Sequence, residues 1–416
     1  MPLLPVLFLS HLDVVPVANE TLSNWTYGPF SGAVKEGYVW GRGALDDKVG
    51  VSALLEACTL LLREGWRPQR TLYFAFGQDE EVGGEMGAAL IAELLARRGV
   101  MVDIVYDEGG SVGADGFPPY TTRPIALIGT AEKGYATINA RVSAAGGHSS
   151  LPPLDGSSAA AVAARLVTSI DRRPPQASLV EPVTSLLAAL APSVPGLRGW
   201  LFALAASGLG SPWVERLVAE AFLAHDAPET AALVRNTAAI TGLNLGFAEN
   251  VLPPAATVRI NFRMLPGSNI SALMDYLHRA AGRDLLHLTF EMDGGQNASL
   301  ATPVTSATNP YFQMLKTALQ EVYQLADGGG RVDVAPTLMA GGTDSKHYLP
   351  ISRGGALRQT PVSLNRTAGD GRRVHGLNER VSVGDFGRAV CVMRRLLMLV
   401  GTLPAPAPAS APAAAS

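Results

Sequence analysis

Short apolar runs that end in acidic or imidazole side chains limit the fold of this 416-residue chain more than any other feature. Helical patterns over 49–64 and 86–98 separate these runs. Short apolar strands that alternate with helices are typical of a parallel sheet covered on both faces. The runs and the side chains that follow them are 6–10 with His11 and Asp13, 38–40 with Asp46 and Asp47, 71–76 with Asp79, Glu80 and Glu81, and 102–106 with Asp107 and Glu108. We therefore predict an α/β fold around a mixed, largely parallel sheet.

The middle of the chain has a different order of elements, which predicts a second domain. The expected elements are a strand over 125–142, a helix over 157–170, strands over 238–245 and 256–264, a helix over 270–281 and a strand over 286–292. This β-α-β-β-α-β order matches an α+β ferredoxin-like unit. A Leu-, Ala- and Trp-rich insertion at about 172–235 interrupts it, and an apolar helix is expected over 385–400.

Together these patterns predict a catalytic domain built from two separate segments, residues 1–130 and 297–400. The α+β lid or dimerisation domain at 131–296 is inserted between them. Residues 401–416 form a Pro/Ala-rich tail that cannot pack a core, and we expect it to be disordered.

The composition excludes several classes of protein. The formal net charge is only −3, which favours neither nucleic acid nor an anionic membrane as a partner. Cys58 and Cys391 are too few for a disulfide framework or a cysteine metal site, so a bound metal would need His, Asp and Glu ligands. The apolar residues 1–10 lack a basic segment and a cleavage site, and 199–210 is too short to span a bilayer. We expect a soluble protein, cytoplasmic unless a missing N-terminal segment carries a signal.

The acidic and imidazole groups at the strand ends predict a metal site. The carboxyl ends of parallel strands meet at one edge of the sheet, where ligands bind. So many carboxylates repel one another there unless cations lie among them. Each motif alone has a structural explanation: a His capped by its Asp at a strand end, a helix N-cap at Asp46-Asp47, or a solvated acidic loop at 79–81. Their shared location favours the metal.

The local geometry of the motifs suggests roles for individual residues. His11 and Asp13 share a face of an extended segment; both could be ligands, and we favour His11 as the ligand with Asp13 orienting it. Asp46 is a candidate to bridge two ions. Glu80 and Glu81 cannot both point into a site from regular strand geometry. A turn is therefore expected to direct Glu81 to a metal and leave Glu80 to take a proton from an attacking water.

Eight motifs follow one another along the chain: SHLDVVP, GRGALDDK, GQDEEVGG, YDEGG, GGHSS, ENVLPP with RINFR, GGTDSKHY and VHGLNER. In this order they resemble the motifs of the dinuclear-zinc carboxypeptidase/aminoacylase family, in particular its carboxypeptidase S and N-fatty-acyl-amino-acid synthase/hydrolase branch. The likeness runs from residue 3 to about residue 400.

The resemblance implies two zinc ions, with Co²⁺ or Mn²⁺ as possible substitutes. One ion would be held by His11, Asp46 and Asp107, and the other by Asp46, Glu81 and His375. Glu80 would be the general base, Asp13 the partner of His11, and the Asp46–Asp47 peptide is expected to be cis. The residues implied to contact substrate are His148, Asn250, Arg263, Gly342 and Thr343.

Several of these assignments have alternatives that the residues alone leave open. Spacing does not choose between His347 and His375 as the late ligand, whereas the H-x-x-N-E context of the family favours His375. His148 is also compatible with an ordinary loop histidine, and Arg263 with a solvent-facing strand residue. Trp200, with the other aromatic residues of the 172–235 insertion, could form a wall for an acyl group or a packing or dimer surface.

The function predicted from the sequence is hydrolysis of an amide bond next to a free carboxylate, in an N-acyl-amino acid or a short peptide. Arg263 would hold the carboxylate, because its planar fork suits bidentate contacts. A homodimer through the lid domain is a possible assembly. The alternative is a non-catalytic or truncated metal-binding protein that binds acyl-amino acids. A non-catalytic relative is expected to have lost Glu80, which this chain keeps.

Overall fold

The computed structural model describes residues 3–210, 212–246, 248–295, 297–324 and 330–402. Its contacts divide the chain into two compact units. Unit 1 comprises the chain up to Thr130, residues 305–335, and the chain from Thr343 onward. Unit 2 comprises Ala131–Val304 and Pro336–Gly342. It therefore continues past residue 296, where the lid domain was expected to end, and includes a second, later segment of the chain. Most of the Pro/Ala-rich tail, from residue 403, lies outside the described residues.

Unit 1 is organised around a six-stranded sheet of order β13-β6-β14-β5-β1-β4. Its strands are β1 (Val6–His11), β4 (Leu72–Gly77), β5 (Ile104–Gly113), β6 (Ile125–Glu132), β13 (Asp333–Met339) and β14 (Ala356–Leu364). β1 pairs in parallel with β4 and β5, and β14 pairs in parallel with β5. β6 is antiparallel to both β5 and β14. The mixed, largely parallel sheet predicted from the sequence is confirmed.

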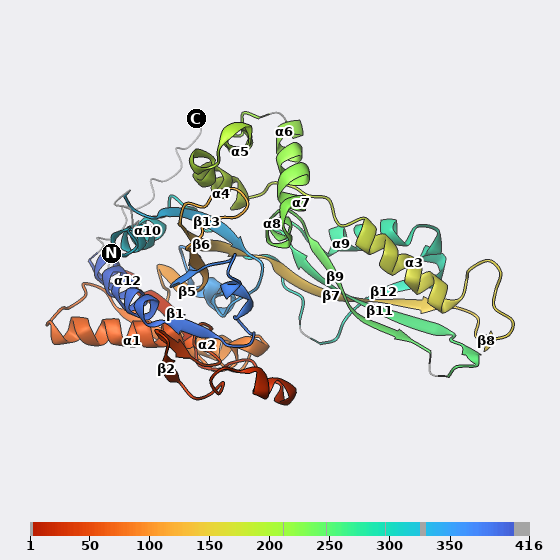
Figure 1. The fold of residues 1–416 in the computed structure, drawn as a ribbon, viewed down its shortest axis with the longest axis horizontal. Helices are drawn as coiled ribbons and strands as arrows, with labels where there is room; N and C mark the ends of the chain where they lie inside the picture. Colours follow the sequence, from red (N-terminus) through yellow and green to blue (C-terminus); the bar gives the residue numbers. More distant parts are fainter. Residues whose placement is uncertain (1–2, 211, 247, 296, 325–329, 403–416) are drawn as a thin grey trace. The chain divides into compact units, whose positions relative to one another are not determined.

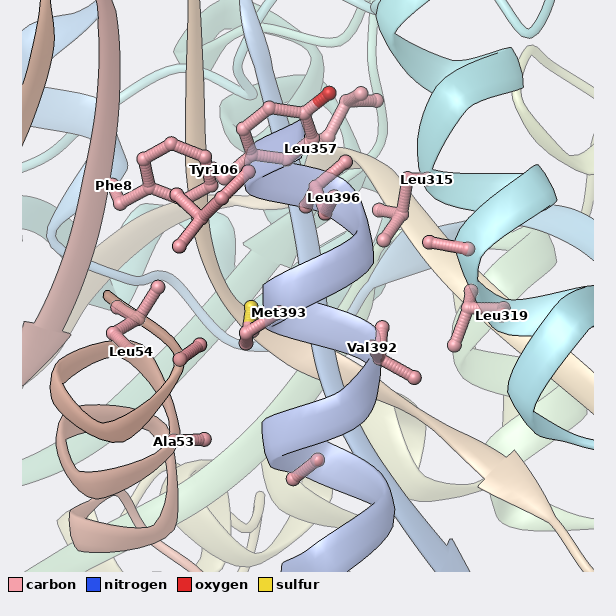
Figure 2. Packing of buried hydrophobic residues seen from close by; sticks show 14 of the residues in the cluster. Phe8, Ala53, Leu54, Tyr106, Leu315, Leu319, Leu357, Val392, Met393 and Leu396 are labelled. Carbon is pink, nitrogen blue, oxygen red and sulfur yellow. The ribbon is translucent and has the colours of Figure 1, made fainter. Parts of the chain in front are cut away.

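Both faces of β1 are buried, because neighbouring side chains on a strand point to opposite faces. Phe8 packs on one face with residues of α1 (Lys48–Arg63), α10 (Pro310–Val322) and α12 (Val383–Gly401). Figure 2 shows this side, where Leu54 of α1, Leu315 of α10 and Met393 of α12 lie around the rings of Phe8 and Tyr106. Leu7 packs on the other face with residues of α2 (Ala88–Arg97). This two-sided cover holds the carboxyl end of β1 in place.

Unit 2 contains a four-stranded antiparallel sheet of order β12-β7-β11-β9. Its strands are β7 (Gly134–Ser143), β9 (Thr237–Leu245), β11 (Ala255–Met264) and β12 (Leu288–Met292). Helices α3 (Ala159–Arg172) and α9 (Ile270–Ala281), capped by Ser158 and Asn269, pack side by side on this sheet (Figure 1). The ferredoxin-like element order is the one expected.

The single strand expected over 125–142 is wrong. This segment forms two strands, β6 and β7, which belong to different sheets. The hydrogen-bonding partners change at Lys133, whose backbone N–H donates to the carbonyl of Met339. A Cβ at Gly134 would lie 2.6 Å from the backbone of Ser299 and of Ala301, so this point needs a glycine. A continuous apolar pattern reports burial but does not report a change of sheet.

The insertion in unit 2 is helical. Its helices are α4 (Val183–Leu190), α5 (Gly196–Ala206), α6 (Pro212–Leu217), a π-helical turn (Val218–Leu223), α7 (Ala224–Asp226) and α8 (Pro228–Val234). Phe202 is buried, whereas Trp200 and Trp213 expose more than half of their surface. No helix within the described ranges has both the length and the hydropathy needed to cross a membrane.

Candidate metal centre

The carboxylate of Asp46 lies between two imidazoles. Its Oδ1 is 2.9 Å from Nε2 of His11, and its Oδ2 is 2.9 Å from Nε2 of His375. His11 is the last residue of β1, and His375 lies in the loop before β15 (Arg380–Ser382). Asp46 lies in the turn before α1, and the Asp46–Asp47 peptide is cis, as predicted. One carboxylate shared by two imidazole nitrogens is the arrangement expected of a ligand that bridges two ions.

Two further carboxylates complete the cluster, one beside each imidazole. Glu81 Oε2 is 3.1 Å from Nε2 of His375, and Glu108 Oε1 is 3.3 Å from Nε2 of His11. The potential ligand atoms of His11, Asp46 and Glu81 all lie within 4.8 Å of one another, and so do those of His11, Glu80 and Glu108. His347 is not part of the cluster, because its Nε2 lies 2.8 Å from the carbonyl oxygen of Gly83.

Glu108, the neighbour of the expected ligand Asp107, has its Oε1 3.3 Å from Nε2 of His11. Both lie on β5, where the pairing with β14 shifts register between Asp107 and Gly110. Asp107 Oδ2 accepts a hydrogen bond from the backbone N–H of Ser345, 2.7 Å away, and its Oδ1 accepts one from the N–H of Glu108. The sequence pattern YDEGG contains both acids, and only the register of β5 decides which one faces the imidazole.

Glu80 and Glu81 leave the sheet on a 3₁₀ turn (Glu80–Val82) directly after β4. This is the turn that adjacent acids require in order to point in different directions. Asp13 holds the turn, because its two carboxylate oxygens accept hydrogen bonds from the backbone N–H groups of Glu80, at 3.2 Å, and Glu81, at 3.1 Å. Asp13 Oδ1 also lies 3.3 Å from Nδ1 of His11. Asp13 therefore orients His11 and the two glutamates together.

Burial and mutual repulsion shift several acids of the cluster toward their protonated forms, whereas for Asp46 the effect of burial is outweighed by the hydrogen bond and charge of His11, which lower its pKa. Burial raises the pKa of Glu80 to about 8, with added repulsion from Asp344 and Asp107. Burial likewise raises the pKa of Asp47 to about 7 and that of Glu108 well above its ordinary value. Burial would lower the pKa of His11, but the hydrogen bonds to Asp46 and Glu108 raise it far above its usual range. The cluster holds more negative charge than its own residues neutralise.

The donor set fits divalent metal ions of the zinc type. Imidazole nitrogen and carboxylate oxygen are ordinary zinc ligands. When Nδ1 of His11 donates to the carbonyl of Asp13, 3.1 Å away, the neutral ring directs the lone pair of Nε2 at the oxygens of Asp46 and Glu108. The Nε2 lone pair and these carboxylate oxygens repel one another, and a cation placed between them would attract both. Glu81 Oε1 is also buried without a hydrogen-bond partner, as expected of a ligand atom.

The other predicted site residues lie mostly in unit 2. His148 is exposed in the short strand β8 (Gly147–His148), with Nδ1 2.8 Å from Ser150 Oγ, and Asn250 is exposed in the turn before β10 (Val251–Leu252). Arg263 of β11 is partly buried, with its guanidinium 5.0 Å from the ring centre of Tyr135. Gly342 is exposed at the end of unit 2, whereas Thr343 is buried in unit 1.

Sequence reasoning missed two more residues near the centre, Arg42 and Glu379. Glu379 is fully buried and accepts hydrogen bonds from the backbone beside Asp46, and Arg42 forms an ion pair with it. Both lie inside the motifs GRGALDDK and VHGLNER, so the motifs marked the segments but not the contact.

Comparison with known proteins is consistent with this centre. The model of peptidase family M20/M25/M40 matches residues 7–399. A probable carboxypeptidase S-like protein of Dictyostelium discoideum is 34% identical over 93% of this chain and 70% of its own length. The N-fatty-acyl-amino acid synthase/hydrolase PM20D1 of Xenopus tropicalis is 33% identical over 91% and 69%.

Solved structures show the same fold. An M20 family metallo-carboxypeptidase of Sulfolobus solfataricus superposes with a TM-score of 0.65 at 17% identity, over 96% of this chain and 85% of that one. The family model covers almost the whole chain, and acids and imidazoles that could hold a metal are gathered at one edge of the sheet. The chain therefore belongs to peptidase family M20/M25/M40 and is a metal-dependent hydrolase of amide bonds.

Proposed function

We propose that this chain uses two zinc ions to hydrolyse the amide bond of an N-acyl-amino acid or a short peptide that ends in a free carboxylate. The observation that carries the proposal is Asp46, whose two oxygens each lie 2.9 Å from a different imidazole. Co²⁺ and Mn²⁺ are expected substitutes, because they accept the same nitrogen and oxygen ligands.

Each ion would have its own ligands in addition to Asp46. His11 and Glu108 would hold one ion, and His375 and Glu81 the other. Glu108 is proposed beside the sequence's candidate Asp107, because Glu108 Oε1 lies 3.3 Å from Nε2 of His11. Glu108→Gln is expected to lower the bound zinc to about one ion per chain, whereas Asp107→Asn retains two. Metal analysis of both variants decides the assignment, and the reverse result would restore Asp107 as the ligand.

The reaction needs a polarised carbonyl, a general base for the attacking water and a proton donor for the leaving amine. Bound zinc ions would polarise the scissile carbonyl and make the attacking water more acidic. Glu80 would accept the proton of that water and deliver it to the leaving amine nitrogen. Its place on the 3₁₀ turn, held by Asp13 and beside the ligand Glu81, supports this role.

Substrate recognition is assigned to Arg263, His148, Asn250, Gly342 and Thr343. Support for Arg263 is its charge: it is partly buried, and no ion pair to a carboxylate is found for it among the described residues. An anionic end group of the substrate would supply the missing partner. His148 would polarise the scissile carbonyl.

The lid domain is the proposed surface for a homodimer. Strand β9 lies at the edge of the four-stranded sheet and pairs there with β11 alone. An edge strand of this kind can pair with a second copy of itself.

A panel of substrates tests the proposed function. N-acetyl, N-lauroyl and N-oleoyl amino acids and simple dipeptides are incubated with the protein, with and without a chelator, while zinc is counted per chain. We expect release of free amino acid that stops with the chelator and returns with zinc, at about two zinc ions per chain. Tight binding of acyl-amino acids without cleavage would instead support a binding protein, and a folded chain that takes up no metal would refute the centre itself.

A further inference from the structure

A buried ion pair lies behind the metal centre and contacts both loops that carry its ligands. Arg42 Nη1 is 2.5 Å from Glu379 Oε2, and both side chains are almost completely buried. The guanidinium also lies 5.5 Å from the ring centre of Trp25. The two residues are 337 positions apart, so the pair joins the first and last parts of unit 1.

The second carboxylate oxygen of Glu379 binds the loop that carries Asp46. Oε1 accepts hydrogen bonds from the backbone N–H groups of Leu45, at 2.9 Å, and Asp46, at 3.2 Å. Asp46 follows strand β3 (Tyr38–Trp40) through a turn and precedes α1, so neither element fixes its backbone directly. Glu379 is therefore the side chain that fixes the position of the carboxylate shared by the two imidazoles.

The second terminal nitrogen of the Arg42 guanidinium binds the loop that carries His375. Nη2 donates to the backbone carbonyl of His375, 3.0 Å away. His375 has a φ of 58° and Asn378 a φ of 56°, in the left-handed region that is unfavourable for residues with a Cβ. A loop with two such residues keeps its shape only when surrounding contacts hold it. Arg42 provides such a contact at the ligand residue itself.

We propose that Arg42 and Glu379 are positioning residues that set the separation of Asp46 from His375 and thereby the affinity for the metal ions. This inference rests on the proposed metal centre. One ion pair reaches both loops, so a change in either partner is transmitted to both ligands. A group that orients ligands in this way commonly contributes a factor of about 10–100 to metal affinity.

The chain offers a matched control in a second buried ion pair. Arg70 Nη1 lies 3.2 Å from Asp103 Oδ2, both side chains are almost fully buried, and the Arg70 guanidinium is 5.7 Å from the ring centre of Tyr311. This pair has the same chemistry and a similar aromatic neighbour. Tyr311 and Arg353 also contact this pair, and neither is a proposed ligand. Asp103→Asn therefore reports the general cost of weakening a buried ion pair in unit 1.

The test measures zinc affinity by competition with a chromophoric chelator, alongside thermal unfolding of the metal-free proteins. In Glu379→Gln the negative charge opposite Arg42 is lost. The neutral amide has one oxygen acceptor in place of two, so it accepts hydrogen bonds from Arg42 and from the two backbone N–H groups less well than the carboxylate does. We expect zinc dissociation constants about 10–100-fold higher for both ions, because Asp46 is shared. In Arg42→Lys the charge stays, but an ammonium lacks the fork that reaches Glu379 and His375 together. We expect that variant to weaken mainly the ion held by His375.

The outcomes separate the inference from the proposed function. Weaker zinc binding in both variants, with wild-type affinity in Asp103→Asn, supports the positioning role. Equal affinity in all four proteins overturns it while the metal centre stands. Wild-type protein that binds no zinc refutes the centre itself. If Glu379→Gln does not fold, Arg42→Lys carries the test, and if neither folds while Asp103→Asn does, the pair is structural and the inference is wrong.

Discussion

The two units of this protein differ in the sign of the charge that gathers around their predicted site residues. Unit 1 gathers carboxylates at one edge of its sheet, where Glu80, Asp47 and Glu108 have raised pKa values because they are buried together. In unit 2 the predicted substrate-binding residue Arg263 is a partly buried cation, and the nearby Lys133 is buried. Arg263 lies over Tyr135, and burial with the nearby charge of Arg263 lowers the pKa of Lys133 to about 7.

Sheet geometry explains this difference. In unit 1 the parallel strands β1, β4 and β5 bring their carboxyl ends to one edge, so polar groups that follow them meet there. In unit 2 the antiparallel strands alternate in direction, and their side chains are spread over two faces of the sheet. The first arrangement needs added cations, and the second leaves an arginine that needs an added anion. Each prediction below tests one side of that comparison.

The largest effect is expected when the proposed base is removed from the acidic edge of unit 1. Glu80→Gln keeps the size of the side chain but cannot accept the proton of the attacking water. We expect kcat to fall by about 10²–10⁴-fold, with two zinc ions still bound. Steady-state kinetics and metal analysis measure the two quantities. The exposed neighbour Glu85, changed to Gln, is the control. Full activity of Glu80→Gln would show that the base is another residue.

Removal of the metal is expected to destabilise the protein, because the carboxylates around Asp46 then face one another without cations. Zinc at about 1,000 times its dissociation constant contributes about 4 kcal/mol to folding. With an unfolding entropy of about 2.1 cal/mol/K per residue, this corresponds to a rise in the unfolding midpoint of roughly 5 °C for the 416-residue chain. Calorimetry of the metal-free protein with and without zinc measures it, and Mg²⁺, which prefers oxygen ligands, is the control. An unchanged midpoint would mean that the acids of unit 1 need no cation.

On the cationic side, Arg263→Lys is expected to weaken recognition of the free carboxylate. A lysine retains the charge but not the bidentate contact, and kcat/KM should fall by roughly 10–100-fold, since a hydrogen bond to a charged group contributes about 1.5–3 kcal/mol. The same variant should hydrolyse the methyl ester of the substrate as the wild type does. Arg259→Lys, two residues earlier on β11 and exposed, is the matched control. Equal losses on acid and ester would remove Arg263 from carboxylate binding.

The smallest effect concerns Lys133, whose Nζ donates to the carbonyls of Ala232 and Arg235. Its pKa is about 7 in the folded chain and near 10.4 when unfolded, so between these values the unfolded chain binds more protons. Its contribution to stability is therefore lowest below pH 7 and rises with pH, by at most about 1.4 kcal/mol per pH unit. Urea unfolding of wild type and Lys133→Met at pH 7 and pH 9 measures it. A stability difference that does not change with pH would show that Lys133 stays charged.

Much of the fold could be predicted because the spacing of apolar residues indicates which side chains are buried. The α9 helix covers 270–281 as expected, and Ser158 caps α3 one residue inside the expected start. The pattern failed where hydrogen-bond partners decide the structure. β5 continues to Gly113 although DEGG looks like a loop, because β14 pairs with it as far as Leu364. The segment over 125–142 divides into two strands for the same kind of reason.

The candidate site could be predicted to the level of the motif. The segments that carry His11, Asp46, Glu81 and His375 come together as the resemblance implied, and the structure separates His347 from them. That Glu108 lies close to His11 could not be predicted from the sequence. Its position depends on the irregular pairing of β5 with β14, which shifts register between Asp107 and Gly110.

The sequence by itself determined which residue types meet at the edge of the sheet, because each apolar run places the acid or imidazole that follows it at the carboxyl end of a strand. Only the tertiary structure decided that Glu108 faces His11, that Asp46 lies between two imidazoles, and that Arg42 reaches Glu379 across 337 residues. The physical reason is the distance along the chain over which each property acts. Burial and periodicity are local properties of the chain, whereas an ion pair or a shared carboxylate depends on strand register and loop contacts that no local pattern contains.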